Sequence, residues 1–234
     1  ELSPKQVYRD LLDRVRLAED IGMEHSWVAE HHFTDYCLAP SPLTAIAWLV
    51  GQTKRMKFAP GILVLPLYDP VRLAQEIAMV DLMADGRLEL GVGFGYQEYE
   101  FQGFRVPLEE AASRALEVLD IVEGALANGK FAYNGAFHKI NDTVMAVRPT
   151  NPRLTTYLAG ATRHPIFPRR AVKKGYIPFV YNGWNSFDMI VSMRENYDQI
   201  AREEGVDPLG IPMAIERFIY VTDSKADALW AAEN

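Results

Sequence analysis

The sequence predicts an α/β fold in which helices cover a parallel sheet, and most simply a (β/α)8 barrel. Two observations predict it. Short apolar runs of strand length alternate with longer amphipathic segments of helical period, which is the pattern of parallel strands joined by helices. Only six such core runs follow one another, so we expect the first and last strands of the barrel to lie before Glu1 and after Asn234. The alternative is an open doubly wound sheet, whose two edges would be unpaired.

The first half of the chain repeats a unit of strand, loop and helix. A serine or aspartate followed by proline begins each helix, at residues 3–4, 41–42 and 69–70, because the side chain caps the helix and proline fits its first turn. We expect helices over residues 7–20, 43–53 and 71–84, and strands over residues 26–32, 57–65 and 87–94.

A hairpin interrupts this alternation in the second half. A long helix is expected from Leu108 to Ala127, and Asn134-Gly135 between alternating residues then indicates a β-turn. We interpret the region near 130–148 as an insertion in a single, partial barrel domain over residues 1–234. The alternation then resumes, with strands expected over residues 155–160, 176–182 and 211–222, and helices over 168–175, 186–204 and from Asp223 or Ser224 onward.

Composition narrows the kind of partner. The net charge is −7 and no basic cluster occurs, which argues against nucleic acid or an acidic membrane surface. The lone Cys37 cannot form an internal disulfide, and no run approaches the roughly 20 apolar residues of a membrane helix. We therefore expect a small-molecule partner and a cytoplasmic protein.

Two adjacent histidines, His31 and His32, follow Glu30 at the end of the first strand. Successive side chains of a strand point to opposite faces, so only one could face the barrel interior unless the strand is already turning. Adjacent histidines are a poor metal pair for the same reason, and we expect no metal. The pattern favours proton handling or hydrogen bonding in a pocket. A structural pair, or a metal-dependent hydrolase that also uses Glu30 and Asp35, remains the alternative.

Small residues end two other strands. GVGFG (91–95) departs from the dinucleotide fingerprint, because Tyr96 takes its last glycine place and residues 97–99 are expected to form a loop. Such glycines either admit a flat ligand to the backbone or allow tight packing inside the barrel. AGATR (159–163) could hold a phosphate through its amides, Thr162 and Arg163, or be an ordinary loop.

Three segments together resemble the bacterial luciferase-like family of flavin-dependent monooxygenases. They are EHHFTDY (30–36), GILVLPLYDPVRLAQE (61–76) and DLMADGRLELGVGFGY (81–96), and the similarity runs to about Thr222. The resemblance implies a TIM barrel whose mouth binds reduced FMN, supplied by a flavin reductase, or in some branches a deazaflavin coenzyme. In the FMN members, reduced flavin and dioxygen oxygenate a small organic substrate. A homodimer is also implied.

The resemblance also implies roles for individual residues. His31 matches the family histidine that is proposed to act as a base or to protect the peroxide, and His32 is its neighbour, while Glu30 lies beside the flavin ring. Gly61-Ile62 falls where the family has a non-proline cis peptide under that ring. Gly93 occupies the place of a reactive cysteine in luciferases, which excludes thiol chemistry there. The other residues implied at the cofactor are Phe94, Gly95, Tyr96, Ala159, Gly160, Ala161, Thr162 and Arg163.

Phe94 is a departure from the family pattern. The family often has arginine there, paired with the flavin phosphate, and phenylalanine cannot donate a hydrogen bond to phosphate. We expect Thr162 and Arg163 to bind the anion instead, and a non-catalytic flavin-binding relative is a further alternative. The aromatic residues Phe33, Tyr96 and Trp184 are expected either to line the substrate pocket or to belong to the core.

Overall fold

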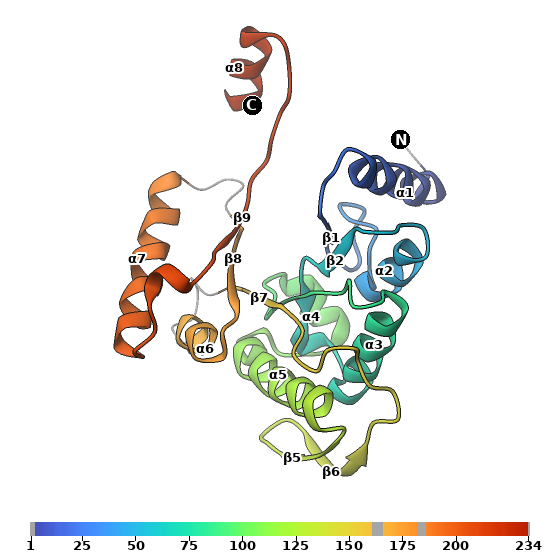
Figure 1. Cartoon of the computed structure of the whole chain (residues 1–234), viewed down its shortest axis with the longest axis vertical. Helices are drawn as coiled ribbons and strands as arrows, with labels where there is room; N and C mark the ends of the chain where they lie inside the picture. Colours follow the sequence, from blue (N-terminus) through green and yellow to red (C-terminus); the bar gives the residue numbers. More distant parts are fainter. Residues whose placement is uncertain (1–2, 161–165, 182–185, 234) are drawn as a thin grey trace.

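A series of parallel strands forms the centre of the molecule (Figure 1). The structure, a computed structural model, describes residues 3–160, 166–181 and 186–233. An isolated parallel bridge between Phe58 and Leu88 joins a two-stranded sheet to a five-stranded one. In spatial order the strands are β1 (His25–Val28), β2 (Lys57–Pro60) with its continuation β3 (Leu63–Val64), β4 (Leu90–Gly93), β7 (Thr156–Ala159), β8 (Ile177–Tyr181) and β9 (Ala214–Glu216).

All six expected core runs contain a parallel strand, and the α/β class is confirmed. Each of these strands is shorter than the run expected for it. The run over residues 26–32 leaves the strand after Val28, and the run over 211–222 contributes only β9. The run over 57–65 is divided into β2 and β3 at Gly61 and Ile62, and the peptide bond between these two residues is cis, as the resemblance implied.

Helices follow the strands largely where the sequence places them. Ser3 accepts a hydrogen bond from the backbone N–H of Gln6, and Asp69 accepts one from Arg72, so two of the expected caps are formed. The helices are α1 (Pro4–Asp20), α2 (Pro42–Val50), α3 (Pro70–Met83), α4 (Glu98–Phe104), α5 (Ala111–Asn128), α6 (Ile166–Lys174), α7 (Phe187–Glu203) and α8 (Lys225–Glu233), with short 3-10 turns at η1 (Leu65–Leu67), η2 (Leu108–Glu110) and η3 (Pro208–Gly210).

One helix contradicts the sequence interpretation. Residues 97–99 were expected to form a loop, but Gln97 is the N-cap residue of α4, which begins at Glu98. Its seven residues are too few for a clear helical period, so the sequence pattern did not reveal it. α4 contributes a buried acid, Glu100, to the site described below.

The region between α5 and β7 contains an antiparallel hairpin of β5 (Lys130–Asn134) and β6 (Lys139–Val144). It lies beside α5, at one end of the molecule (Figure 1). Glu117 on α5 accepts hydrogen bonds from the backbone N–H groups of Ala136, Phe137 and His138, which form the hairpin's connecting loop. One carboxylate therefore fastens the tip of the hairpin to the helix.

The core lies between the strands and helices α2, α3 and α5, which contact one another. Phe58, Ile46 and Leu73 are fully buried there. Burying a side chain of this size stabilises a fold by roughly 1.5–3 kcal/mol. The amino ends of the strands are closed by Arg87, whose guanidinium donates to the carbonyl oxygens of Val50 and Met56.

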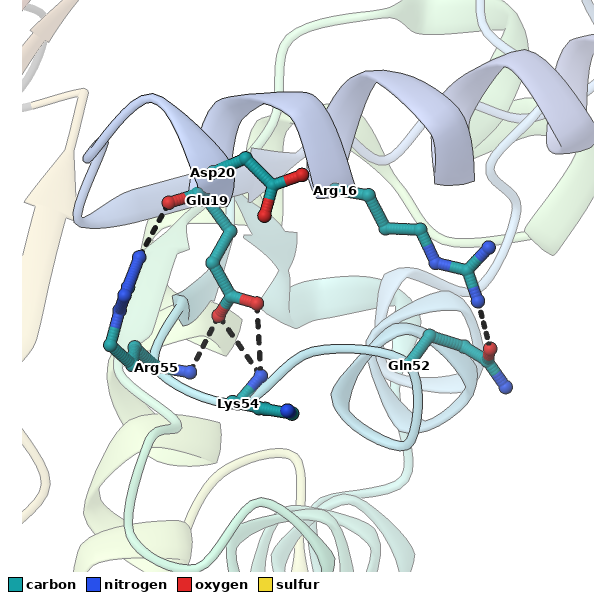
Figure 2. A pocket seen from close by; sticks show the side chains of 6 residues that line it. All are labelled: Arg16, Glu19, Asp20, Gln52, Lys54 and Arg55. Carbon is teal, nitrogen blue, oxygen red and sulfur yellow. Dashed lines mark hydrogen bonds between the residues drawn. The ribbon is translucent and has the colours of Figure 1, made fainter.

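A polar hollow of about 460 Å³ also lies at the amino end of the strands (Figure 2). Its main polar groups already have protein partners. Glu19, near the end of α1, accepts hydrogen bonds from the backbone N–H groups of residues 54–56, and Arg16 donates to Gln52. This hollow is at the opposite end of the strands from the sequence-predicted site residues, so we assign it to the base of the fold.

Candidate functional site

The carboxyl ends of the strands bring together the residues that the sequence singles out. Glu30 to His32 follow β1, Gly61 and Ile62 separate β2 from β3, and residues 94–96 follow β4. Ala159 ends the neighbouring strand β7, and Gly160 follows it. In parallel α/β folds this edge of the sheet is where ligands bind. The expected site residues Ala161, Thr162, Arg163 and Trp184 lie outside the described residues.

The chain turns sharply as it leaves β1, and this turn decides how the histidines lie. The strand ends at Val28, and Phe33 takes a left-handed backbone conformation with φ of 58°. Strand alternation therefore does not apply to His31 and His32. Each ring instead lies against a different buried carboxylate.

Glu30 holds the ring of His32. Its Oε1 lies 2.9 Å from Nε2 of His32, and its Oε2 accepts hydrogen bonds from the phenol of Tyr68 (2.7 Å) and the backbone N–H of Val64 (3.2 Å). Only 3% of Glu30 is exposed. Burial, together with the adjacent Glu30, raises the pKa of Tyr68 well above its usual range, so the phenol remains a donor. The carboxylate is thus occupied by protein groups, although the resemblance placed Glu30 beside the flavin ring.

His31 is held by Glu100, a residue that the sequence interpretation missed. Oε1 of Glu100 lies 3.0 Å from Nδ1 of His31 and also accepts the backbone N–H of His32 at 2.9 Å. Glu100 is 1% exposed. The sequence signal for Glu100 is its spacing from Phe104, because residues four positions apart on a helix share one face. In the structure both side chains contact the histidine pair.

Aromatic rings surround the two histidines. The ring of Phe104 meets that of His32 edge-on, with centroids 4.7 Å apart, and Phe33 lies 5.5 Å from Phe104. Tyr36 makes an edge contact with His31 at 5.4 Å. Phe33 and Tyr36 are 67% and 77% exposed. These exposed rings give the carboxyl end of the sheet an apolar surface that an organic ring can contact.

The glycines of this end are explained by close packing. A Cβ on Gly91 would collide with the carbonyl oxygen of Pro60 and lie 2.9 Å from the ring of Trp27. A Cβ on Gly93 would collide with Cδ1 of Ile62. Of the two interpretations left open by the sequence, tight packing of the interior is therefore favoured at Gly91 and Gly93.

Phe94 packs against the end of β7. Its ring centroid lies 5.0 Å from that of Phe167 on α6, and a Cβ on Gly160, whose φ is 84°, would lie 2.5 Å from the Phe94 ring. The ring thus occupies the space in which the family often carries an arginine. A hollow of about 250 Å³ opens beside it, lined by Phe94, Gly95, Tyr96, Leu108, Glu109, Ala111 and Ala112.

The described residues also bear on a metal site and on a membrane span. No group of three or more histidine, cysteine, aspartate or glutamate side chains there is arranged to hold a metal ion. The metal-hydrolase alternative therefore has no ligand set within that part of the chain. None of the helices described is both long enough and apolar enough to cross a lipid bilayer.

The sequence profile of the luciferase-like monooxygenases matches residues 1–233. The chain belongs to this family. An uncharacterised protein, y4vJ of Sinorhizobium fredii, is 35% identical over 96% of the chain and 64% of its own length. The oxygenase component of a flavin-dependent trigonelline monooxygenase from Acinetobacter baylyi is 28% identical over 97% of the chain and 63% of that relative.

Solved structures of luciferase-like proteins and their relatives show the same fold. The monooxygenase RslO1 from Streptomyces bottropensis superposes with a TM-score of 0.91 at 24% identity, covering the whole chain and 71% of that protein. The oxygenating constituent of 3,6-diketocamphane monooxygenase from Pseudomonas putida, solved with FMN, gives 0.84 at 21% identity over 97% of the chain and 65% of that protein. The expected barrel class is thereby confirmed. The chain spans less than two thirds of the length of each of the two curated relatives described above.

Proposed function

We propose that this luciferase-like chain forms the flavin site of a monooxygenase that uses reduced FMN and dioxygen to oxygenate a small organic substrate. The observation that carries the proposal is His31, a ring held by a buried carboxylate at the carboxyl end of the sheet. The flavin-dependent relatives support the cofactor class. A separate flavin reductase belongs to the same proposal, because one relative is named as the oxygenase component of its enzyme.

The residues present fit the ring part of a flavin better than its phosphate. Exposed aromatic side chains at the carboxyl end of the sheet provide an apolar surface for a flat ring. Gly61, Ile62 and Gly95 would line it, with Tyr96 beside them. Phe94 offers no donor to an anion. Thr162 and Arg163 remain our prediction for the phosphate, and Arg163→Ala should weaken FMN binding measured by titration; unchanged affinity would contradict it.

A bound reduced flavin would supply the two electrons with which dioxygen is activated. The chain's own residues would handle the proton and exclude water. His31 would take up or hold a proton at Nε2, since its Nδ1 already faces Glu100. His32, fixed by Glu30 and packed on Phe104, would keep the loop after β1 in place. Phe33 and Tyr36 would cover the site against solvent.

Anaerobic titration of the full-length protein with reduced FMN, followed by absorbance, tests the proposal. We expect saturable binding of reduced FMN, and, after oxygen is admitted, a faster appearance of oxidised-flavin absorbance and of hydrogen peroxide in His31→Ala than in the wild type. No binding of reduced FMN would overturn the monooxygenase proposal. The same titration with a deazaflavin coenzyme tests the alternative cofactor.

We also propose that the protein is a homodimer and lies in the cytoplasm. Met79, Leu82 and Met83 lie on one side of α3, three and four residues apart, and Trp48 lies on the adjoining helix α2. All four are between 39% and 55% exposed. A contiguous apolar helix face of this kind favours association with a second copy of the chain.

A further inference from the structure

A single oxygen atom of Glu100 contacts both histidines. Its Oε1 accepts the backbone N–H of His32 and lies within hydrogen-bonding distance of Nδ1 of His31. The Glu100 side chain is 2% exposed and the His31 side chain 14%. Because water has little access to the pair, the hydrogen bond is not in competition with solvent.

This contact selects one tautomer of His31. An ionised carboxylate can only accept hydrogen bonds, so the proton of the neutral imidazole lies on Nδ1 and the lone pair on Nε2. Among the described residues, Nε2 of His31 has no hydrogen-bond partner. The basic nitrogen is therefore the one left for a ligand.

We propose that Glu100 is a positioning residue that fixes His31 as the Nδ1–H tautomer and so leaves the lone pair of Nε2 directed to a ligand. Only the catalytic consequence rests on the proposed flavin chemistry. The tautomer of His31 is a property of the flavin-free chain.

The other titratable groups around His31 do not replace this carboxylate. Tyr36 presents a ring to His31, and Cys37 lies on the same loop, where burial and then Glu100 raise the pKa of its thiol. His32 would repel a protonated His31, but its ring is paired with a carboxylate of its own. Glu100 is therefore the anion that contacts the His31 ring.

Nitrogen-15 NMR of the flavin-free, full-length protein as a function of pH tests the inference directly. His31→Gln assigns the resonances, which is practical because the chain has five histidines. We expect the wild-type ring to carry its proton on Nδ1 at high pH. In Glu100→Gln the side-chain amide can donate to Nδ1, so the Nε2–H tautomer should appear, whereas Glu100→Asp, which keeps a carboxylate, should retain the Nδ1–H tautomer.

Glu98→Gln is the matched control. Glu98 lies on the same helix but faces solvent, where it accepts a hydrogen bond from Gln102. Its replacement should leave the His31 tautomer unchanged. A wild-type Nε2–H tautomer, or the same Nδ1–H tautomer in folded Glu100→Gln as in the wild type, would overturn the proposal. The wild-type tautomer decides the matter even if Glu100→Gln fails to fold.

The activity measurement separates this inference from the proposed function. If His31 is the base, product formed per reduced FMN oxidised should fall in Glu100→Gln and recover in Glu100→Asp. If the tautomer changes in Glu100→Gln and product formation does not, the positioning role of Glu100 stands and His31 is not the base.

Discussion

The phenol of Tyr68 donates a 2.7 Å hydrogen bond to Glu30, the residue that holds His32 at the carboxyl end of the sheet. A similar bond occurs at the opposite end, where Tyr157 donates to Glu89 at 3.0 Å. Burial and this hydrogen bond raise the pKa of Tyr157 to about 12. Two tyrosine–glutamate pairs of the same chemistry therefore lie at the two ends of the strands, and they can be compared directly.

Removing either phenol should cost stability, but only one should affect the site. Tyr68→Phe and Tyr157→Phe should each lower the free energy of unfolding in urea by about 1–2 kcal/mol, because each leaves a buried carboxylate short of one donor. Tyr68→Phe should also weaken reduced-FMN binding, since Glu30 and His32 lose their anchor, whereas Tyr157→Phe should not. Equal flavin affinity in the two variants would contradict this link.

The contact between Gly93 and Ile62 can be tested by a double substitution. Gly93→Ala should lower the free energy of unfolding by about 1–3 kcal/mol, because its Cβ would collide with Cδ1 of Ile62. Ile62→Val removes that carbon, so the double variant should recover most of the loss. Gly124→Ala is the control, since a Cβ there meets nothing within 4 Å in the middle of α5, and we expect it to stabilise by roughly 0.5–1 kcal/mol. Purely additive effects of the two substitutions would exclude the contact as the cause.

Docking of the hairpin should depend on pH through Glu117. Burial opposes its ionisation, but hydrogen bonds from the hairpin loop and from His138 hold the pKa of this carboxyl below its usual value. A lowered folded-state pKa means that the stabilisation is present above the unfolded pKa, about 4.3, and is lost as the pH falls through the folded value. Amide hydrogen exchange should therefore show the loop at residues 135–138 opening at acidic pH.

In Glu117→Gln the loop at residues 135–138 should already be open at pH 7. Its amide hydrogen exchange should then show no further opening as the pH falls through the same range. Glu109→Gln is a suitable control, because Glu109 is exposed near the start of α5 and makes no contact with the hairpin loop among the described residues. Identical exchange in the wild type and Glu117→Gln at both pH values would show that the carboxylate does not hold the hairpin.

The apolar face of α3 gives a prediction about assembly. Leu82→Glu should shift the full-length protein toward the monomer in sedimentation experiments, because a charge in an apolar interface must be desolvated without a partner. Leu17→Glu on α1 is the matched control, since Leu17 is also an exposed leucine, at 60%. If both variants sediment as the wild type does, the dimer forms elsewhere or does not form.

The sequence by itself determined the alternation of strands and helices, the helix caps, and the presence of the Glu30, His31 and His32 triplet at a strand end. These features follow from local rules. Apolar periodicity, proline in a first helical turn and glycine at a turn act within a few residues of one another, so they can be read from a short stretch of chain.

Only the tertiary structure decided what the triplet is joined to. Glu100 is 69 positions from His31, and Tyr68 is 38 from Glu30, so no local pattern connects them. The strand ends earlier than its apolar run, and for that reason both histidines face carboxylates rather than opposite sides of the sheet. The glycines likewise looked equally suited to a ligand or to packing, until the positions of Trp27 and Ile62 showed which side chains fill the space. Such contacts depend on which distant segments the folded chain brings together.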